Sequence, residues 1–261
     1  MDFTLKKYKS LLTSFLDAGY SFQTVEEFLQ FPKEKVVILR HDVDLKAINA
    51  LYTAKIEHGL GIKASYYFRF IPQSNQPTII KEIVSLGHEI GYHYEDLSLF
   101  RGDKTRAIQH FEKQLTHFRQ FYPIQTICMH GSPTSKIDNR TIWQYVDYRV
   151  FGIIAEPYFD IDFNKVFYLT DTGRRWDGDR FSVRDKVSST YNLSFRKTSD
   201  IIDTLKRGEL PIQIMINTHP QRWTNNKIEW YKELILQNIK NIVKSLLINQ
   251  INNQRSLTKG K

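Results

Sequence analysis

Two aspartates, Asp42 and Asp44, follow the apolar run 36–39, which predicts a buried strand. Successive side chains of an extended chain point to opposite sides, so carboxylates two residues apart project to the same side. Such a pair could bind a metal ion or exchange protons with a substrate. The alternative is that both aspartates lie in a loop and cap the next helix, because Asp44 directly precedes a helix-like segment.

Four further ionisable residues stand at the ends of predicted strands: His93, His130, Asp171 and His219. The carboxyl ends of parallel strands share one rim in α/β folds, and active sites are built there. We therefore expect these side chains to converge on the two aspartates. A mixture of imidazole and carboxylate suits zinc and its divalent neighbours, so the pattern favours a metal site.

The elements that must position these residues alternate along the chain. We predict strands at residues 36–41, 64–70, 88–93, 125–130, 165–171 and 211–219. We predict helices at residues 3–18, 47–58, 78–86, 104–121, 199–207 and 226–250. Parallel neighbours need a crossover between them, so this alternation predicts a parallel α/β architecture, either a doubly wound sheet or a barrel. With 41% apolar residues among 261, one domain over residues 1–261 can bury a single core.

The last predicted helix carries a stripe of apolar residues. They recur at helical spacing: Ile228, Tyr231, Ile235, Ile239, Ile242 and Leu246. The stripe predicts one long amphipathic helix at the end of the fold.

Three motifs carry a resemblance to a known family: HDVD at 41–44, GHEIGYHYE at 87–95 and NTHP at 217–220. In this order they resemble the polysaccharide deacetylase family (NodB-homology, carbohydrate esterase 4), over residues 36–220. The resemblance implies a distorted (β/α)7-type barrel of about seven strands with a bound divalent metal. The barrel core would span about 36–220, with helical extensions at 1–30 and 225–255.

The resemblance also implies roles for individual residues. Asp42 would be the catalytic base, Asp44 and His93 metal ligands, and His219 the general acid. The metal would be zinc, with Co, Fe, Ni or Mn as alternatives. Family members usually carry a second metal histidine four residues after the first, where this chain has Leu97.

The third metal ligand must then come from elsewhere. We favour His130, which ends a strand and precedes Gly131, with Glu95 as the alternative. Asp96 could also reach back toward the metal. Five residues of strand separate His88 from His93 by about 16 Å, so both cannot bind one ion, and we interpret His88 as structural or as a partner of a ligand.

The segment 170–185 is rich in charge and glycine for a stretch that follows a strand. It is either a solvated loop or a sugar or phosphate pocket. Four residues in it offer fork-shaped donors, an acceptor and a flat apolar face, as such a pocket needs: Asp171, Arg174, Arg175 and Trp176. Trp223 could add a second platform or pack in the core.

The remaining histidines have simpler interpretations. His41 precedes Asp42 and points to the opposite side of the strand, so we expect a buried histidine with backbone hydrogen bonds. His58, His110 and His117 lie on predicted helices, and we expect ordinary surface or half-buried residues.

Composition limits the partners and the location. The net charge is +9, but the 37 basic residues are spread among 28 acidic ones without an aromatic and basic module, so we expect no nucleic-acid partner. The charge fits anionic substrates such as nucleotide sugars. No apolar window is long enough for a transmembrane segment. The single Cys128 cannot form an internal disulfide, and the amino terminus carries charges, so we expect a cytoplasmic protein.

These inferences predict a metal-dependent deacetylase or amide hydrolase. It would remove an acyl group, expected to be acetyl, from an N-acylated sugar or a related small amide. A nucleotide-linked or lipid-linked sugar in cell-surface polysaccharide synthesis fits best. Because of Leu97, a metal-free carbohydrate-binding or regulatory protein on the same scaffold is the alternative, and a phosphoester hydrolase is a third hypothesis.

Overall fold

The fold is built on one seven-stranded sheet in which every pair of neighbouring strands is parallel. The computed structural model describes residues 1–132, 134–177 and 184–259, with side chains as far as residue 243. The strand order is β5-β4-β3-β2-β7-β6, and β1 also pairs with β2. The strands are β1 (Ser21–Gln23), β2 (Val36–Val43), β3 (Ser65–Phe68), β4 (Glu89–Tyr94), β5 (Ile127–Met129), β6 (Phe167–Thr170) and β7 (Gln213–Thr218).

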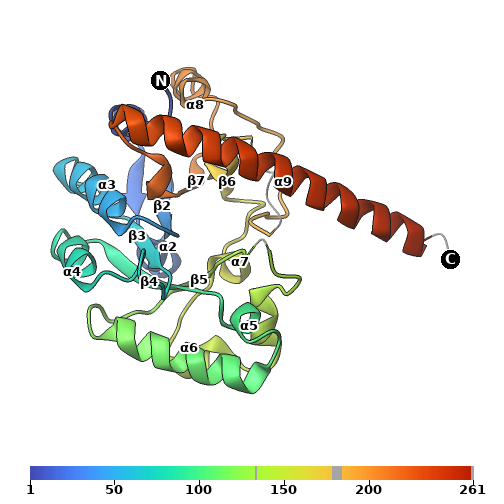
Figure 1. Cartoon of the computed structure of the whole chain (residues 1–261). Coiled ribbons are helices and arrows are strands. Elements are labelled where there is room, and N and C mark those ends of the chain that lie inside the picture. Colours follow the sequence, from blue (N-terminus) through green and yellow to red (C-terminus); the bar gives the residue numbers. More distant parts are fainter. Residues whose placement is uncertain (133, 178–183, 260–261) are drawn as a thin grey trace.

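Helices surround the sheet, which curls into a half-barrel (Figure 1). They are α1 (Leu5–Asp17), α2 (Val25–Gln30), α3 (Ala47–Gly59), α4 (Pro77–Ser85), α5 (Asp96–Leu99), α6 (Lys104–Arg119), α7 (Pro157–Asp160), α8 (Thr198–Lys206) and α9 (Lys227–Lys259). The predicted parallel α/β class is confirmed. A half-barrel is compatible with the predicted distorted barrel, and the NodB type itself stays a prediction.

The amino-terminal segment belongs to the fold's core, although we predicted it as an extension outside the barrel. Thr4 caps α1 by accepting a hydrogen bond from the Lys7 amide (3.1 Å). The apolar residues of α1 at helical spacing are fully buried: Tyr8, Leu11, Leu12 and Phe15. The next segment supplies β1, which was missed because three residues are too short to show a periodic pattern.

β2 lies in the middle of the sheet, and all eight of its residues are buried. Its two faces enter different apolar clusters. Val37, Leu39 and Val43 face the helices, whereas Val36 and Ile38 face the interior of the half-barrel. The same alternation places Arg40 and Asp42 on the inner face.

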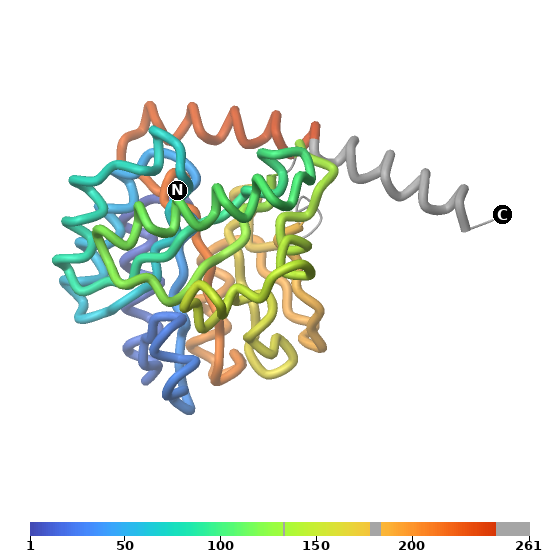
Figure 2. The backbone as a smooth tube through the Cα atoms, turned by 90° about the horizontal axis from the view of Figure 1, so that it is seen from below, coloured from blue at the N-terminus to red at the C-terminus, as the bar shows by residue number. Residues whose placement is uncertain are grey.

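The last helix, α9, runs along one side of the molecule (Figures 1 and 2). It begins at Lys227, as predicted to within one residue, and continues to Lys259. None of the helices in the described part of the chain is both long and apolar enough to cross a bilayer.

Gly91 in β4 makes room for the buried Tyr67 ring on the neighbouring strand. A Cβ atom at this position would overlap the ring and lie 2.8 Å from the Thr126 carbonyl oxygen. The Tyr67 hydroxyl bonds to the Thr126 hydroxyl (2.9 Å), so the ring cannot move aside without breaking a buried hydrogen bond.

We expect Gly91→Ala to lower the free energy of unfolding by about 1 to 3 kcal/mol or more, because the core there is already filled. Urea unfolding followed by circular dichroism measures the change. Gly59→Ala, where nothing lies within 4 Å of the new Cβ, is the matched control and should leave stability unchanged or slightly raised. Equal stability of both variants would contradict the expectation.

Candidate functional site

A cavity of about 480 Å³ opens at the carboxyl ends of the strands. Five of the six residues predicted to converge line it, all except Asp171: Asp42, Asp44, His93, His130 and His219. They come from four different strand ends, and the parallel sheet delivers them to one rim.

The Asp44 carboxylate is the centre of this group. Its Oδ1 lies 3.4 Å from His130 Nε2 and 3.6 Å from His93 Nε2, and its Oδ2 lies 3.9 Å from His219 Nε2. Within the described residues, the buried Oδ1 has no hydrogen-bond partner. Ligand atoms around a tetrahedral zinc ion are separated by about 3.3 to 3.5 Å, so these residues fit a small divalent metal.

Each of the three histidines is held by its other ring nitrogen. Each Nδ1 faces an oxygen that can only accept a hydrogen bond, which favours a proton on Nδ1 and a free Nε2, although Nδ1 of His219 also lies 2.7 Å from Arg222 Nη1, which can only donate. The acceptors are the Cys128 carbonyl for His93 (2.9 Å), Glu95 for His130 (2.8 Å) and Asp171 for His219 (2.6 Å). Outer partners of this kind orient histidine ligands toward a metal.

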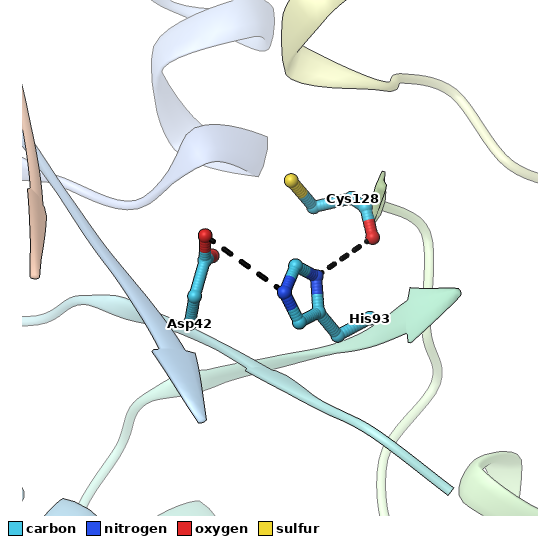
Figure 3. Close-up of side chains that lie close together, drawn as sticks. All are labelled: Asp42, His93 and Cys128. Atoms are coloured by element: carbon cyan, nitrogen blue, oxygen red, sulfur yellow. Dashed lines mark hydrogen bonds and ion pairs between the residues drawn. The ribbon is translucent and has the colours of Figure 1, made fainter. Parts of the chain in front are cut away.

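A second set of possible metal ligands also includes His93. Asp42, His93 and Cys128 are buried with their ligand atoms within 4.8 Å of one another, and together they could hold a metal ion (Figure 3). Two features weigh against this group. Burial raises the pKa of the Cys128 thiol well above its usual value. Arg40 also occupies both carboxylate oxygens of Asp42.

Arg40 forms a two-pronged ion pair with Asp42, with distances of 2.9 Å and 2.7 Å. Burial by itself would raise the pKa of Asp42, but the Arg40 charge, helped by His93 and His219, holds it well below the usual range. Asn217 Nδ2 donates a further hydrogen bond to Asp42 (3.0 Å). The carboxylate is therefore ionised at neutral pH and held in one orientation.

The pKa of Asp44 is also well below its usual value. Burial opposes the shift, and the three neighbouring imidazoles, His93, His130 and His219, outweigh it. The pKa of His93 is raised in return, because Asp42 and Asp44 outweigh the effect of its burial. The site thus concentrates negative charge where a cation would bind.

Glu95 lies behind His130 instead of facing Asp44. It accepts from His130 Nδ1 and forms an ion pair with Arg69 (2.6 Å). Burial opposes ionisation, yet these two partners lower the pKa of Glu95 to about 2. Glu95, which we predicted as the alternative third metal ligand, is therefore a hydrogen-bond partner of His130. Leu97, at the position of the family's second histidine, is buried in the apolar core.

The four residues predicted to bind a sugar do not line the cavity. Asp171 lies behind His219, and its carboxylate also accepts from Arg222 Nη1 (2.5 Å) and Trp223 Nε1 (2.8 Å). After it the chain turns through η3 (Thr172–Arg174), where Gly173 has a φ of +75°. After this turn, residues 174–176 lie away from the cavity. The prediction that they form a sugar or phosphate pocket with Asp171 is therefore wrong.

The other three members of that predicted pocket have structural partners. Arg174 donates to the Trp230 carbonyl of α9 (2.8 Å), and Arg175 pairs with Asp177 (2.6 Å). Trp176 is buried, and its Nε1 donates to the Thr198 hydroxyl (2.9 Å). The rest of the predicted loop, residues 178–183, lies outside the described residues. Trp223 packs in the core as well, with its ring fully buried.

Two residues of the site were missed from the sequence. Arg40 stands two residues before Asp42, so the alternation that paired Asp42 with Asp44 could have placed it on the same face. Asp185 lines the cavity and accepts from the hydroxyls of Tyr158 (2.7 Å) and Tyr168 (2.5 Å). Asp185 ends the segment 170–185 that was considered as a pocket, but nothing in the sequence distinguished it from the other charged residues there.

His41 and His88 lie outside the cavity. His41 is buried on the opposite face of β2, as expected, but its partners are side chains: Thr218 Oγ1 (2.6 Å) and Glu57 (2.9 Å). His88 is held between the Ala54 carbonyl and the Ala64 amide. The histidines on helices are exposed or half-buried: His58, His110 and His117.

Comparison with protein-family models and with curated proteins found no match for this chain. Interpretation of the site therefore depends on its geometry and chemistry.

We expect the purified protein to bind one equivalent of zinc per chain, measured by mass spectrometry of the metal after reconstitution and dialysis. His93→Ala and His130→Ala should each weaken zinc binding by more than about 100-fold. Loss of a residue that only holds a metal ligand in place weakens binding by about 10- to 100-fold. His58→Ala, which removes an exposed histidine, should bind like the parent chain. Full zinc occupancy in His130→Ala would contradict its assignment as a ligand.

Cys128→Ser distinguishes the two donor groups. If Asp44, His93 and His130 bind the metal, this variant keeps its zinc, and the cobalt-substituted parent shows no thiolate-to-cobalt absorption band in the near ultraviolet. Loss of zinc together with such a band in the parent would assign the metal to Asp42, His93 and Cys128.

Proposed function

We propose that this protein is a metal-dependent hydrolase that removes an acyl group, expected to be acetyl, from the nitrogen of an N-acylated sugar or related small amide. One observation carries the proposal. Two imidazoles, His93 and His130, present Nε2 to the unpaired Oδ1 of Asp44, and a third, His219, faces Oδ2 of the same carboxylate, next to the ionised Asp42 in an open cavity. The order of the sequence motifs supports the same reaction class.

We assign Asp44, His93 and His130 as the residues that would hold the metal, with zinc as the preferred ion. When bound, a zinc ion polarises a carbonyl group and lowers the pKa of water toward about 7. The two proton transfers of the reaction are assigned to side chains of the protein.

Asp42 would accept the proton of the attacking water at a carboxylate oxygen. Arg40 and Asn217 fix its orientation and keep it ionised, so it is ready to accept the proton at neutral pH. The ion pair with Arg40 also makes Asp42 a weaker base than a free aspartate carboxylate, so its contribution depends on its fixed position. The water oxygen then bonds to the amide carbon.

His219, in its imidazolium form with both ring nitrogens protonated, would supply the Nε2 proton to the departing nitrogen as the carbon–nitrogen bond breaks. Its Nε2 faces the cavity, while Nδ1 donates to the buried Asp171. A carboxylate in this position stabilises the charged imidazolium and fixes the orientation of the ring. Arg222 and Trp223 hold Asp171 in turn, so the acid is positioned by a buried network.

The cavity offers further polar groups to a sugar. The buried Gln221 Oε1 has no partner among the described residues and lines the cavity, so it can accept from a hydroxyl or amide. Asp185 and Arg69 add an acceptor and a donor to the wall. We propose a nucleotide-linked or lipid-linked N-acyl sugar as the substrate class.

We expect Asp42→Asn to keep its metal while turnover falls by about 10²- to 10⁴-fold, because the variant loses the group that accepts the proton. Release of acetate from N-acetylated sugars, measured with a coupled enzymatic assay, checks this. Asp17→Asn, which changes an exposed aspartate on α1, is the control and should retain full turnover. Undiminished turnover in Asp42→Asn would remove this residue as the base.

A metal-free carbohydrate-binding protein is the second candidate, since Leu97 replaces the family's second histidine with a buried apolar side chain. It predicts sugar binding without metal and without hydrolysis. A phosphoester hydrolase would instead cleave phosphate esters while N-acyl sugars stay intact.

A further inference from the structure

The outer face of α9 is apolar and uncovered. Five residues of the predicted stripe are each more than half exposed: Ile228, Tyr231, Ile235, Ile239 and Ile242. Leu236 and Val243 widen the exposed apolar surface on one side. In a globular protein a stripe of this kind usually faces the core. Here it faces away from it.

The opposite, polar face of α9 fixes this orientation. Gln237 and Asn241 are buried, and Asn241 donates to the Gly173 carbonyl (2.9 Å). Trp230 anchors the start of the helix, since its carbonyl accepts from Arg174 and its Nε1 donates to the Asp2 carbonyl (2.7 Å). Rotating the stripe inward would break all of these hydrogen bonds. Figure 2 shows the rest of the chain on the other side of this part of α9.

The shape of the apolar surface suits a flat partner. At 100° per residue, the seven exposed apolar residues cover an arc of about 140°, and one exposed charged residue, Lys232, lies within it. A coiled coil with a second copy needs a narrow seam with alternating steps of three and four residues. One register of that seam, begun at Ile228 and Tyr231, contains Asn238 and Ser245. The other register contains Ile235, Ile239, Ile242 and Leu246 but has Lys232 before them and Asn249 after them. The heptad pattern is therefore interrupted by polar residues.

The charges on α9 indicate the chemistry of the partner. Over residues 227–243, the exposed charged side chains are all basic: Lys227, Lys232 and Lys240. The two acidic residues of this segment, Glu229 and Glu233, are half-buried. The whole chain carries a net charge of +9. Lysines beside a wide apolar arc are typical of helices that lie in the surface of an anionic bilayer.

We propose that α9 docks the protein on an anionic lipid bilayer, with the apolar arc inserted among the lipid headgroups, Lys227 and Lys240 at its flanks, and Lys232 extending from within the arc to the headgroups. Ile239 and Val243 also line the cavity, so docking brings the mouth of the cavity to the membrane surface. The inference rests on α9 alone and stands whether or not the site hydrolyses amides. If it does, the arrangement favours a lipid-linked substrate over a freely diffusing one.

Flotation of the full chain with vesicles tests the proposal. We expect binding to vesicles of two parts phosphatidylcholine and one part phosphatidylserine, and at least about tenfold weaker binding to pure phosphatidylcholine or at high salt. The triple variant Ile228→Ser, Ile235→Ser, Ile242→Ser should also bind at least about tenfold less, because it loses the apolar arc.

The matched control removes three exposed apolar residues elsewhere: Phe31→Ser, Val150→Ser and Ile212→Ser. It should float like the parent chain, and circular dichroism should show both triple variants folded. Equal losses in the two variants, or no flotation of the parent at either composition, would overturn the proposal. So would light scattering that shows a dimer of the parent, abolished in the α9 variant, since a second copy would then cover this face.

Discussion

The buried negative charge at the end of β2 is the constraint on which the rest of the site depends. Asp42 and Asp44 both lose most of their hydration, and such charges persist in a protein interior only when they are compensated. Arg40 and Asn217 compensate Asp42, and the three histidines surround Asp44. The unpaired Asp44 Oδ1 marks the place where compensation from the described residues is incomplete.

The compensation is built in layers from different parts of the chain. Each histidine near Asp44 is itself held by a group behind it, and Glu95 and Asp171 are held in turn by Arg69 and by Arg222. This arrangement favours a proton on Nδ1 of His93 and His130 and holds the ring of His219 in one orientation. A site with its proton positions fixed before the substrate arrives needs little reorganisation during a reaction.

Successive side chains of β2 point to opposite faces of the sheet, so the strand contributes to two separate polar networks. Arg40 and Asp42 face the cavity, whereas His41 faces a closed network with Glu57, Tyr8 and Thr218. The second network has no opening and therefore serves to align β2 with α3 and β7. Side chains adjacent in the sequence thus stabilise the fold on one face and build the site on the other.

The sequence by itself determined the order of the main elements and the convergence of five ionisable residues, because apolar periodicity and strand ends are local properties. It did not determine that Asp171 lies behind His219, that Glu95 holds His130, or that residues 174–176 turn away from the cavity. Those contacts join residues far apart in the chain, and strand register and a left-handed turn at Gly173 decide them. The same holds for α9, whose stripe was evident in the sequence. Only the anchoring of its polar face by Gly173 and Arg174 decided that the stripe points outward, because tertiary hydrogen bonds override the usual preference of an amphipathic helix.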